Sequence, residues 1–118
     1  MMQKVPYKIS AKELNLWLHK IPSRRPFLVD VREEQEIAIA QFSEPALHLP
    51  LSKSSIWIES LQEHLPKNQP IVVFCHAGIR SWHFGNWLIK ERLTNEVWNL
   101  DGGIDAWSID VDPRVPRY

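Results

Sequence analysis

Residues 71–81 carry the sequence IVVFCHAGIRS, on which the organisation of the whole chain depends. The first four residues, Ile71 to Phe74, are apolar and mostly β-branched, which is typical of a buried strand. Trp82 to Arg92 has the pattern of a helix, so the residues between must turn the chain sharply. Cys75, the only cysteine, therefore lies where a strand gives way to a helix. In an open α/β sheet, ligands bind at this end of the strands.

The turn that follows Cys75 has the features of an anion-binding loop. Backbone N–H groups of the loop and of the first helical turn are free to point at an anion. Arg80 adds a permanent positive charge at the far end of the loop. The same donors favour a thiolate over a thiol, and the thiolate is the nucleophilic form of cysteine.

The composition excludes several classes of protein. One hundred and eighteen residues suit one domain, and 14 basic residues balance 14 acidic ones, which argues against a nucleic-acid surface or a polybasic membrane face. No apolar run reaches the ~18 residues of a membrane span, and the polar start lacks a signal-peptide core, so we expect a cytoplasmic protein.

The cysteine and histidine content bears on metal and cofactor binding. A single cysteine excludes an internal disulfide and a cysteine zinc cluster. The five histidines form no recognisable ligand motif with the thiol or with a carboxylate; they are His19, His48, His64, His76 and His83. We therefore expect neither a metal nor a cofactor.

Strand and helix patterns alternate along the chain. Short apolar runs predict strands at Tyr7–Ile9, Phe27–Val31, Ala46–Leu49, Ile71–Phe74 and Val97–Leu100. Capped or amphipathic stretches predict helices from Ser10 to Ile21, from Glu33 to Ala40, from Ser52 or Ser54 to about Leu65, and from Trp82 to Arg92. Ser108 to Tyr118 is interpreted as a tail over the surface. This alternation predicts an α/β fold, with a roughly five-stranded parallel sheet, helices on both faces and the Cys75 loop at its carboxyl edge.

Three motifs together resemble the rhodanese (sulfurtransferase) family. CHAGIRS at 75–81 is similar to the family's active-site loop, Cys-x-x-Gly-x-Arg followed by Ser or Ala. LVDVREEQE at 28–36 resembles its apolar-Asp-Val-Arg-x-x-x-Glu signature, and LDGGIDAW at 100–107 resembles its Leu-x-Gly-Gly-x-x-Ala-Trp. The motifs stand in the family's order, so we expect a single rhodanese-like domain over residues 8–116, with Gly102-Gly103 bringing the next segment under the active loop.

The resemblance implies a persulfide relay. Cys75 would be the nucleophile that takes a sulfane sulfur from a small anionic donor such as thiosulfate and passes it to a thiol or cyanide. The implied substrate-binding residues are His76, Ala77, Gly78, Ile79 and Arg80. Because no second cysteine can resolve the persulfide, the acceptor would be a small thiol or a cysteine of a partner protein. A proton-transfer role for His76 is a further hypothesis.

Asp30, Arg32 and Ser81 are expected to support the site. Asp30 and Arg32 share one side of their strand, where they either pair to hold neighbouring loops or line the pocket, and the sequence leaves both roles open. The acidic residues 33, 34 and 36 are interpreted as a solvated helix face rather than an acid/base pair.

The segment from Gln41 to Pro50 departs from the family. Rhodaneses usually have a Gly-His-Ile-x-Gly-Ala-like segment here, whereas this chain has QFSEPALHLP. Without those glycines we expect a differently shaped loop, which affects the rim of the pocket and therefore the acceptor.

Three alternatives compete with sulfur transfer. Phosphatases and arsenate reductases on related folds need Cys-x5-Arg to wrap a tetrahedral oxyanion, and this chain has Cys-x4-Arg. The second alternative is a rhodanese-like binding or regulatory module without turnover, although the chain keeps Cys75, Gly78 and Arg80. The third is that Cys75 is a small buried hydrophobe. The sequence leaves the physiological donor and acceptor, the pathway and the oligomeric state open.

Overall fold

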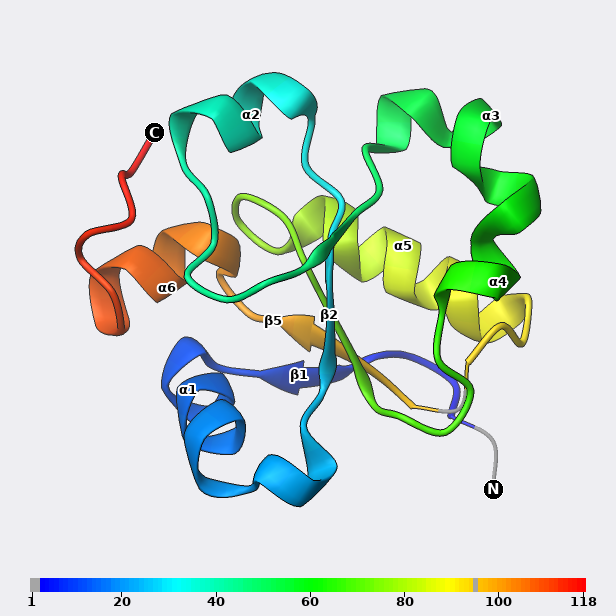
Figure 1. Ribbon diagram of the computed structural model, residues 1–118, viewed down its shortest axis with the longest axis horizontal. Helices are drawn as coiled ribbons and strands as arrows, with labels where there is room; N and C mark the ends of the chain where they lie inside the picture. Colours follow the sequence, from blue (N-terminus) through cyan, green and yellow to red (C-terminus); the bar gives the residue numbers. More distant parts are fainter. Residues whose placement is uncertain (1–2, 95) are drawn as a thin grey trace.

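The computed structural model describes residues 3–94 and 96–118 (Figure 1). Within these residues the strands are β1 (Tyr7–Ile9), β2 (Phe27–Asp30), β3 (Leu47–His48), β4 (Ile71–Phe74) and β5 (Val97–Leu100). They form one five-stranded sheet in the order β1-β5-β4-β2-β3, and every neighbouring pair is parallel. The predicted parallel sheet is therefore confirmed, with two strands one or two residues shorter than expected.

Helices cover both faces of the sheet. They are α1 (Ala11–Lys20), α2 (Glu34–Ile39), α3 (Ser54–Trp57), α4 (Leu61–His64), α5 (Ile79–Lys90) and α6 (Gly103–Asp110). Short 3-10 turns stand at Pro22–Arg24, Leu51–Lys53 and Ile58–Ser60. Figure 1 shows α1 and α6 on one side of the molecule and α3 and α4 on the other. None of the helices in the described part of the chain is long and apolar enough to cross a membrane.

Two apolar clusters fill the space between the sheet and its helices. On one face Leu14 of α1 and Trp107 of α6 pack with Phe74 of β4. On the other face Val73 of β4 packs with Leu88 of α5. All five side chains are at most 1% exposed, as expected for strands that are covered on both sides. Successive residues of β4 therefore anchor opposite faces, and Cys75 follows them directly.

The prediction of one continuous helix from Ser52 or Ser54 to about Leu65 is wrong. The chain forms α3 and α4 with 3-10 turns before and between them. Ile56, Trp57 and Ile58 are adjacent in sequence and so cannot share one helix face. Ile56 stays 75% exposed, whereas the Trp57 indole packs inward and donates to the Pro50 carbonyl at 2.9 Å.

Two further boundaries differ from the prediction. Helix α5 begins at Ile79 rather than at Trp82, because Gly78 adopts a left-handed conformation with φ of 99° and caps the helix. The segment from Ser108 to Tyr118 is not a surface tail throughout. Its first three residues belong to α6, and Val115 is buried, with its carbonyl accepting a hydrogen bond from the Ser108 hydroxyl.

A Gly102-Gly103 turn sets α6 against the loop that follows β4. Both glycines have positive φ, 78° and 61°. The first N–H groups of a helix have no partner within it, and here those of Ile104 and Asp105 donate to the carbonyls of Cys75 and His76 at 2.9 and 3.1 Å. The turn thus brings α6 under the loop, as the family resemblance implied.

Replacing Gly103 by alanine tests how closely the loop and α6 fit. A Cβ atom there would lie 2.5 Å from the Cys75 carbonyl oxygen, at a φ that L-residues rarely adopt. We expect Gly103→Ala to lower the free energy of unfolding by about 2 kcal/mol or more, measured by urea denaturation. Gly85→Ala is the comparison, because its Cβ would meet a Pro6 side-chain atom at 2.8 Å from an ordinary helical conformation, and it should cost less. Equal losses in the two variants would contradict this account.

Candidate active site

The sulfur of Cys75 lies at the base of the loop between β4 and α5. Its Sγ accepts hydrogen bonds from the backbone N–H groups of Gly78 at 3.1 Å and of Ser81 at 3.4 Å. Cys75 is 1% exposed, so these donors act on the sulfur where little water competes. Hydrogen bonds from fixed N–H groups stabilise negative charge on an acceptor. The loop is therefore built to hold a thiolate.

The Ser81 hydroxyl connects Cys75 to Asn99 of β5. Ser81 Oγ lies 3.3 Å from Cys75 Sγ and 2.6 Å from Asn99 Oδ1, and Asn99 Nδ2 donates to the Gly78 carbonyl at 3.0 Å. A hydroxyl has one hydrogen, so Ser81 donates to only one of these two partners at a time. Sequence reasoning missed Asn99, although an amide inside an apolar strand was a usable signal.

The other loop residues lie apart from the sulfur. Ala77 and Ile79 are exposed, with Ile79 at 69%. The His76 ring stacks on the ring of Tyr118, with centroids 4.1 Å apart and planes at 14°. Of the six predicted loop residues, the structure therefore brings Gly78 and Ser81 to Cys75, whereas the side chains of the other four make their contacts elsewhere or are exposed. In the described part of the chain, no three His, Cys, Asp or Glu side chains cluster as a metal site would require.

Arg80 turns toward α2 and pairs with Glu36. Its two terminal nitrogens contact Glu36 Oε1 at 2.6 Å and Oε2 at 2.9 Å, a bidentate geometry. The hydrogen bonds from Arg80 are the main cause that lowers the pKa of Glu36 to about 2, and Glu36 in turn raises the pKa of Arg80. Glu36 has a side chain 14% exposed, so its assignment to a solvated face is wrong. The usable signal was its place as the glutamate of the 28–36 motif.

Tyr118 joins this ion pair to the rest of the network. Its hydroxyl donates to Glu36 Oε2 at 2.8 Å and accepts from Arg32 Nη1 at 3.1 Å. Burial is the main cause that raises the pKa of Tyr118 to about 12, so the phenol stays neutral at physiological pH. Sequence reasoning placed Tyr118 in a surface tail, and nothing in the local pattern indicated its contacts.

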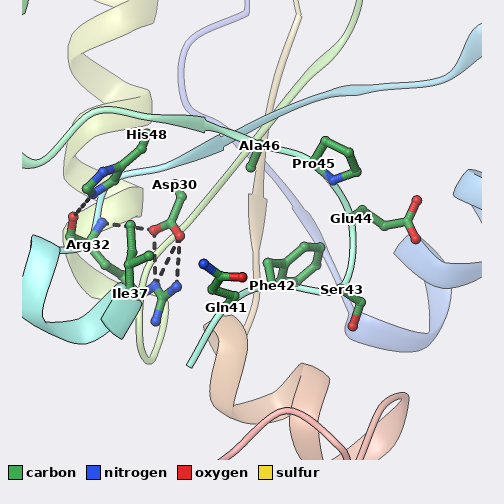
Figure 2. Close-up of a pocket in the computed structure, with 10 residues that line it drawn as sticks. All are labelled: Asp30, Arg32, Ile37, Gln41, Phe42, Ser43, Glu44, Pro45, Ala46 and His48. Atoms are coloured by element: carbon green, nitrogen blue, oxygen red, sulfur yellow. Dashed lines mark hydrogen bonds and ion pairs between the residues drawn. The ribbon is translucent and has the colours of Figure 1, made fainter. Parts of the chain in front are cut away.

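Asp30 and Arg32 form a buried ion pair at the end of β2 (Figure 2). Arg32 is fully buried, with Nη2 at 2.9 Å from Asp30 Oδ2 and 2.8 Å from the Ala40 carbonyl oxygen. The pair borders a cavity of about 360 Å³ that the segment from Gln41 to His48 also lines. These contacts hold the end of α2 to β2, which favours the structural interpretation of the pair. The divergent segment thus shapes this cavity, as Figure 2 shows.

Comparison with known proteins places these features in a family. A model described as rhodanese-like domain matches residues 10–110. The Arabidopsis thaliana Rhodanese-like/PpiC domain-containing protein 12, chloroplastic, is 38% identical over 92 residues, which are 77% of this chain and 30% of that protein. The adenylyltransferase and sulfurtransferase MOCS3 of Drosophila willistoni is 31% identical over 102 residues, 84% of this chain and 22% of that protein. The chain thus spans less than a third of the length of these relatives.

Solved structures agree on the fold. The crystal structure of a rhodanese-like domain protein from Staphylococcus aureus has a TM-score of 0.72 and 24% identity, and the match covers 95% of this chain and 98% of that one. Other matches include proteins named tRNA uridine(34) hydroxylase, from Chlamydia species, and a structure described as a yeast protein tyrosine phosphatase of the Rhodanese family. The fold therefore hosts more than one activity, and the activity must be argued from the site.

The structural and the pocket-lining interpretations of Asp30 predict different effects of replacing this residue. Asp30→Ala leaves the buried Arg32 guanidinium without its carboxylate, so we expect the free energy of unfolding to fall by about 3–5 kcal/mol. Asp30→Asn keeps an acceptor and should cost less. Urea denaturation measures both, and the rate of Cys75 alkylation in the folded protein should change little. Near-native stability combined with a strongly altered alkylation rate would instead assign Asp30 to the site.

The Glu36–Arg80 pair gives stability a defined pH dependence. The folded pKa of Glu36, about 2, lies below its usual value of 4.5, so its stabilisation is fully present above pH 4.5 and is lost as the pH falls through 2. We expect the stability difference between the native protein and Glu36→Gln to be constant down to about pH 5 and then to shrink toward pH 2. Urea denaturation at a series of pH values measures this. A difference as large at pH 2 as at neutral pH would show that the charge of Glu36 is not responsible.

Proposed function

The chain belongs to the family of rhodanese-like domains, and from that premise we propose that it is a sulfurtransferase in which Cys75 carries a sulfane sulfur as a persulfide. The observation that carries the proposal is the position of the Cys75 sulfur, buried and facing the N–H groups of Gly78 and Ser81. An inert buried cysteine needs no such donors, whereas a sulfur that must carry negative charge does.

The proposed reaction has two half-reactions. The Cys75 thiolate attacks the outer sulfur of a donor such as thiosulfate, the donor's S–S bond breaks, and sulfite leaves with the bonding electrons. A persulfide then remains on Cys75. A thiolate or cyanide attacks its terminal sulfur, and Cys75 Sγ leaves as a thiolate. The N–H groups of Gly78 and Ser81 stabilise that leaving group as they stabilise the attacking one, because the charge returns to the same atom. Small thiols or a cysteine of a partner protein are the proposed acceptors.

The geometry weighs against phosphatase chemistry. A tetrahedral phosphate needs a loop closed by an arginine, and Arg80 here faces Glu36 instead of closing the loop. The loop is also one residue shorter than Cys-x5-Arg. We therefore expect aryl phosphates not to be hydrolysed in a Cys75-dependent way.

Intact-protein mass spectrometry tests the proposal directly. After incubation with thiosulfate and removal of excess donor, the native protein should gain the mass of one sulfur atom and lose it again on addition of a thiol. Cys75→Ser is the control and should show no gain. If neither thiosulfate nor another sulfane donor adds sulfur, although iodoacetamide alkylates Cys75, the result would favour a binding module without turnover.

A further inference from the structure

Asn99 of β5 contacts both the loop and the Ser81 hydroxyl through one side-chain amide. Its Nδ2 donates to the Gly78 carbonyl at 3.0 Å, and its Oδ1 lies 2.6 Å from Ser81 Oγ. An amide nitrogen donates and an amide oxygen accepts, so the contact with Gly78 decides that the oxygen faces Ser81. Asn99 is 4% exposed and Ser81 is fully buried, so water does not compete for either side chain.

The Ser81 hydroxyl has two possible acceptors and one hydrogen. Its oxygen lies 3.3 Å from Cys75 Sγ as well as 2.6 Å from Asn99 Oδ1, so the sulfur and the amide oxygen compete for the same hydrogen. A charged acceptor holds a donor more strongly than a neutral one. We therefore expect the hydroxyl to donate to Cys75 while Sγ is a thiolate, and to Asn99 when Sγ is neutral.

Sulfur transfer changes the charge on Sγ. The sulfur is a thiolate before it attacks the donor, and it becomes a neutral bridging atom in the persulfide, where the negative charge lies on the terminal sulfur. Ser81 and Asn99 are buried on the inner side of Sγ, whereas donor and acceptor molecules arrive from solvent, so the terminal sulfur lies on the outer side. The charge therefore moves away from the Ser81 hydroxyl when the persulfide forms, and returns when the persulfide is discharged.

We propose that Asn99 is a positioning residue that takes over the Ser81 hydrogen bond when Cys75 becomes a persulfide and releases it when the thiolate returns. This inference rests on the proposed sulfur transfer. No proton leaves its oxygen, because only the acceptor of the hydrogen bond changes. Without Asn99, the buried hydroxyl would lose its acceptor in the persulfide, whereas the thiolate would hold the hydroxyl without competition. Asn99 thus favours the persulfide relative to the thiolate.

The equilibrium between persulfide and thiolate measures this preference. Native protein and Asn99→Leu are each equilibrated with thiosulfate and sulfite at pH 9.5, above the ~8.5 at which an ordinary cysteine thiol ionises, and the persulfide fraction is read by intact-protein mass spectrometry. Leucine has a similar branched shape and no hydrogen-bonding atom. We expect Asn99→Leu to lower the ratio of persulfide to thiolate about fivefold, with slower loading by thiosulfate and faster discharge by sulfite.

Two controls separate this effect from the loss of the Gly78 contact. In a Ser81→Ala background, Asn99→Leu still removes that contact, but no hydroxyl remains to change partner, so the ratio should stay within about twofold. Asn86→Leu is the matched single variant, because the Asn86 amide also donates to a backbone carbonyl, that of Trp82, at 2.9 Å. We expect Asn86→Leu to leave the ratio unchanged.

Ser81→Ala in the otherwise native protein gives the answer if Asn99→Leu does not fold. The thiolate then loses its hydrogen bond from the hydroxyl, and the persulfide state loses the hydrogen bond between Ser81 and Asn99. Because each state loses one hydrogen bond, the ratio should change by less than about threefold. A larger rise in the persulfide fraction would show that the hydroxyl serves the sulfur alone, and would overturn the role of Asn99.

The remaining outcomes distinguish this inference from the proposed function. Equal slowing of loading and discharge by Asn99→Leu, with an unchanged equilibrium, would overturn the inference and leave Asn99 as an anchor for Gly78. The same shift of the equilibrium with and without the Ser81 hydroxyl would also overturn it. If neither the native protein nor any variant forms a persulfide with thiosulfate, the proposed sulfur transfer itself fails.

Discussion

The conformation of the loop after β4, which brings N–H groups to the Cys75 sulfur, is held by contacts to neighbouring elements. Because each peptide group is planar, a hydrogen bond to its carbonyl fixes the orientation of the whole group. The carbonyls of Cys75 and His76 accept from the first turn of α6, and that of Gly78 accepts from Asn99. The sulfur site therefore depends on α6 and β5 as much as on the loop itself. Without these hydrogen bonds, fewer contacts would restrict the loop to one conformation.

A second set of contacts ties distant segments to the same loop. Asp30 and Arg32 hold the end of β2, Tyr118 bridges Arg32 to Glu36, and Glu36 holds Arg80. Asp30 and Arg32 are buried and the Glu36 side chain is 14% exposed, so the charges of these three groups are weakly screened by solvent. The polar network thus fixes α2 and the segment around Tyr118 relative to α5, while the apolar clusters fix the sheet.

The sequence predicted those features that are encoded by neighbouring residues. Apolar runs marked the strands, and Cys75, Gly78 and Ser81 lie within one turn whose shape follows from a strand, a glycine and a helix. The pairing of Arg80 with Glu36 crosses 44 residues, and that of Tyr118 with Glu36 crosses 82. Periodicity carries no information on such pairs, because it describes which face a residue lies on and not what lies opposite. The break between α3 and α4 was missed for a different reason. The apolar residues 56–58 were all assigned to one helix, although three consecutive residues cannot share one helix face.

The number of backbone N–H groups that face the Cys75 sulfur links the fold to the chemistry. Cys75 Sγ is reached by the N–H groups of Gly78 and Ser81, and α5 begins between them, at Ile79. Arg80 lies in that first helical turn, where its side chain leaves the loop toward α2 instead of closing over the sulfur. These two N–H groups suit a single sulfur atom that carries negative charge, whereas a tetrahedral oxyanion presents several oxygens that each need donors. The start of α5 at Ile79, directly after the left-handed Gly78, therefore favours the proposed sulfur transfer over phosphate chemistry.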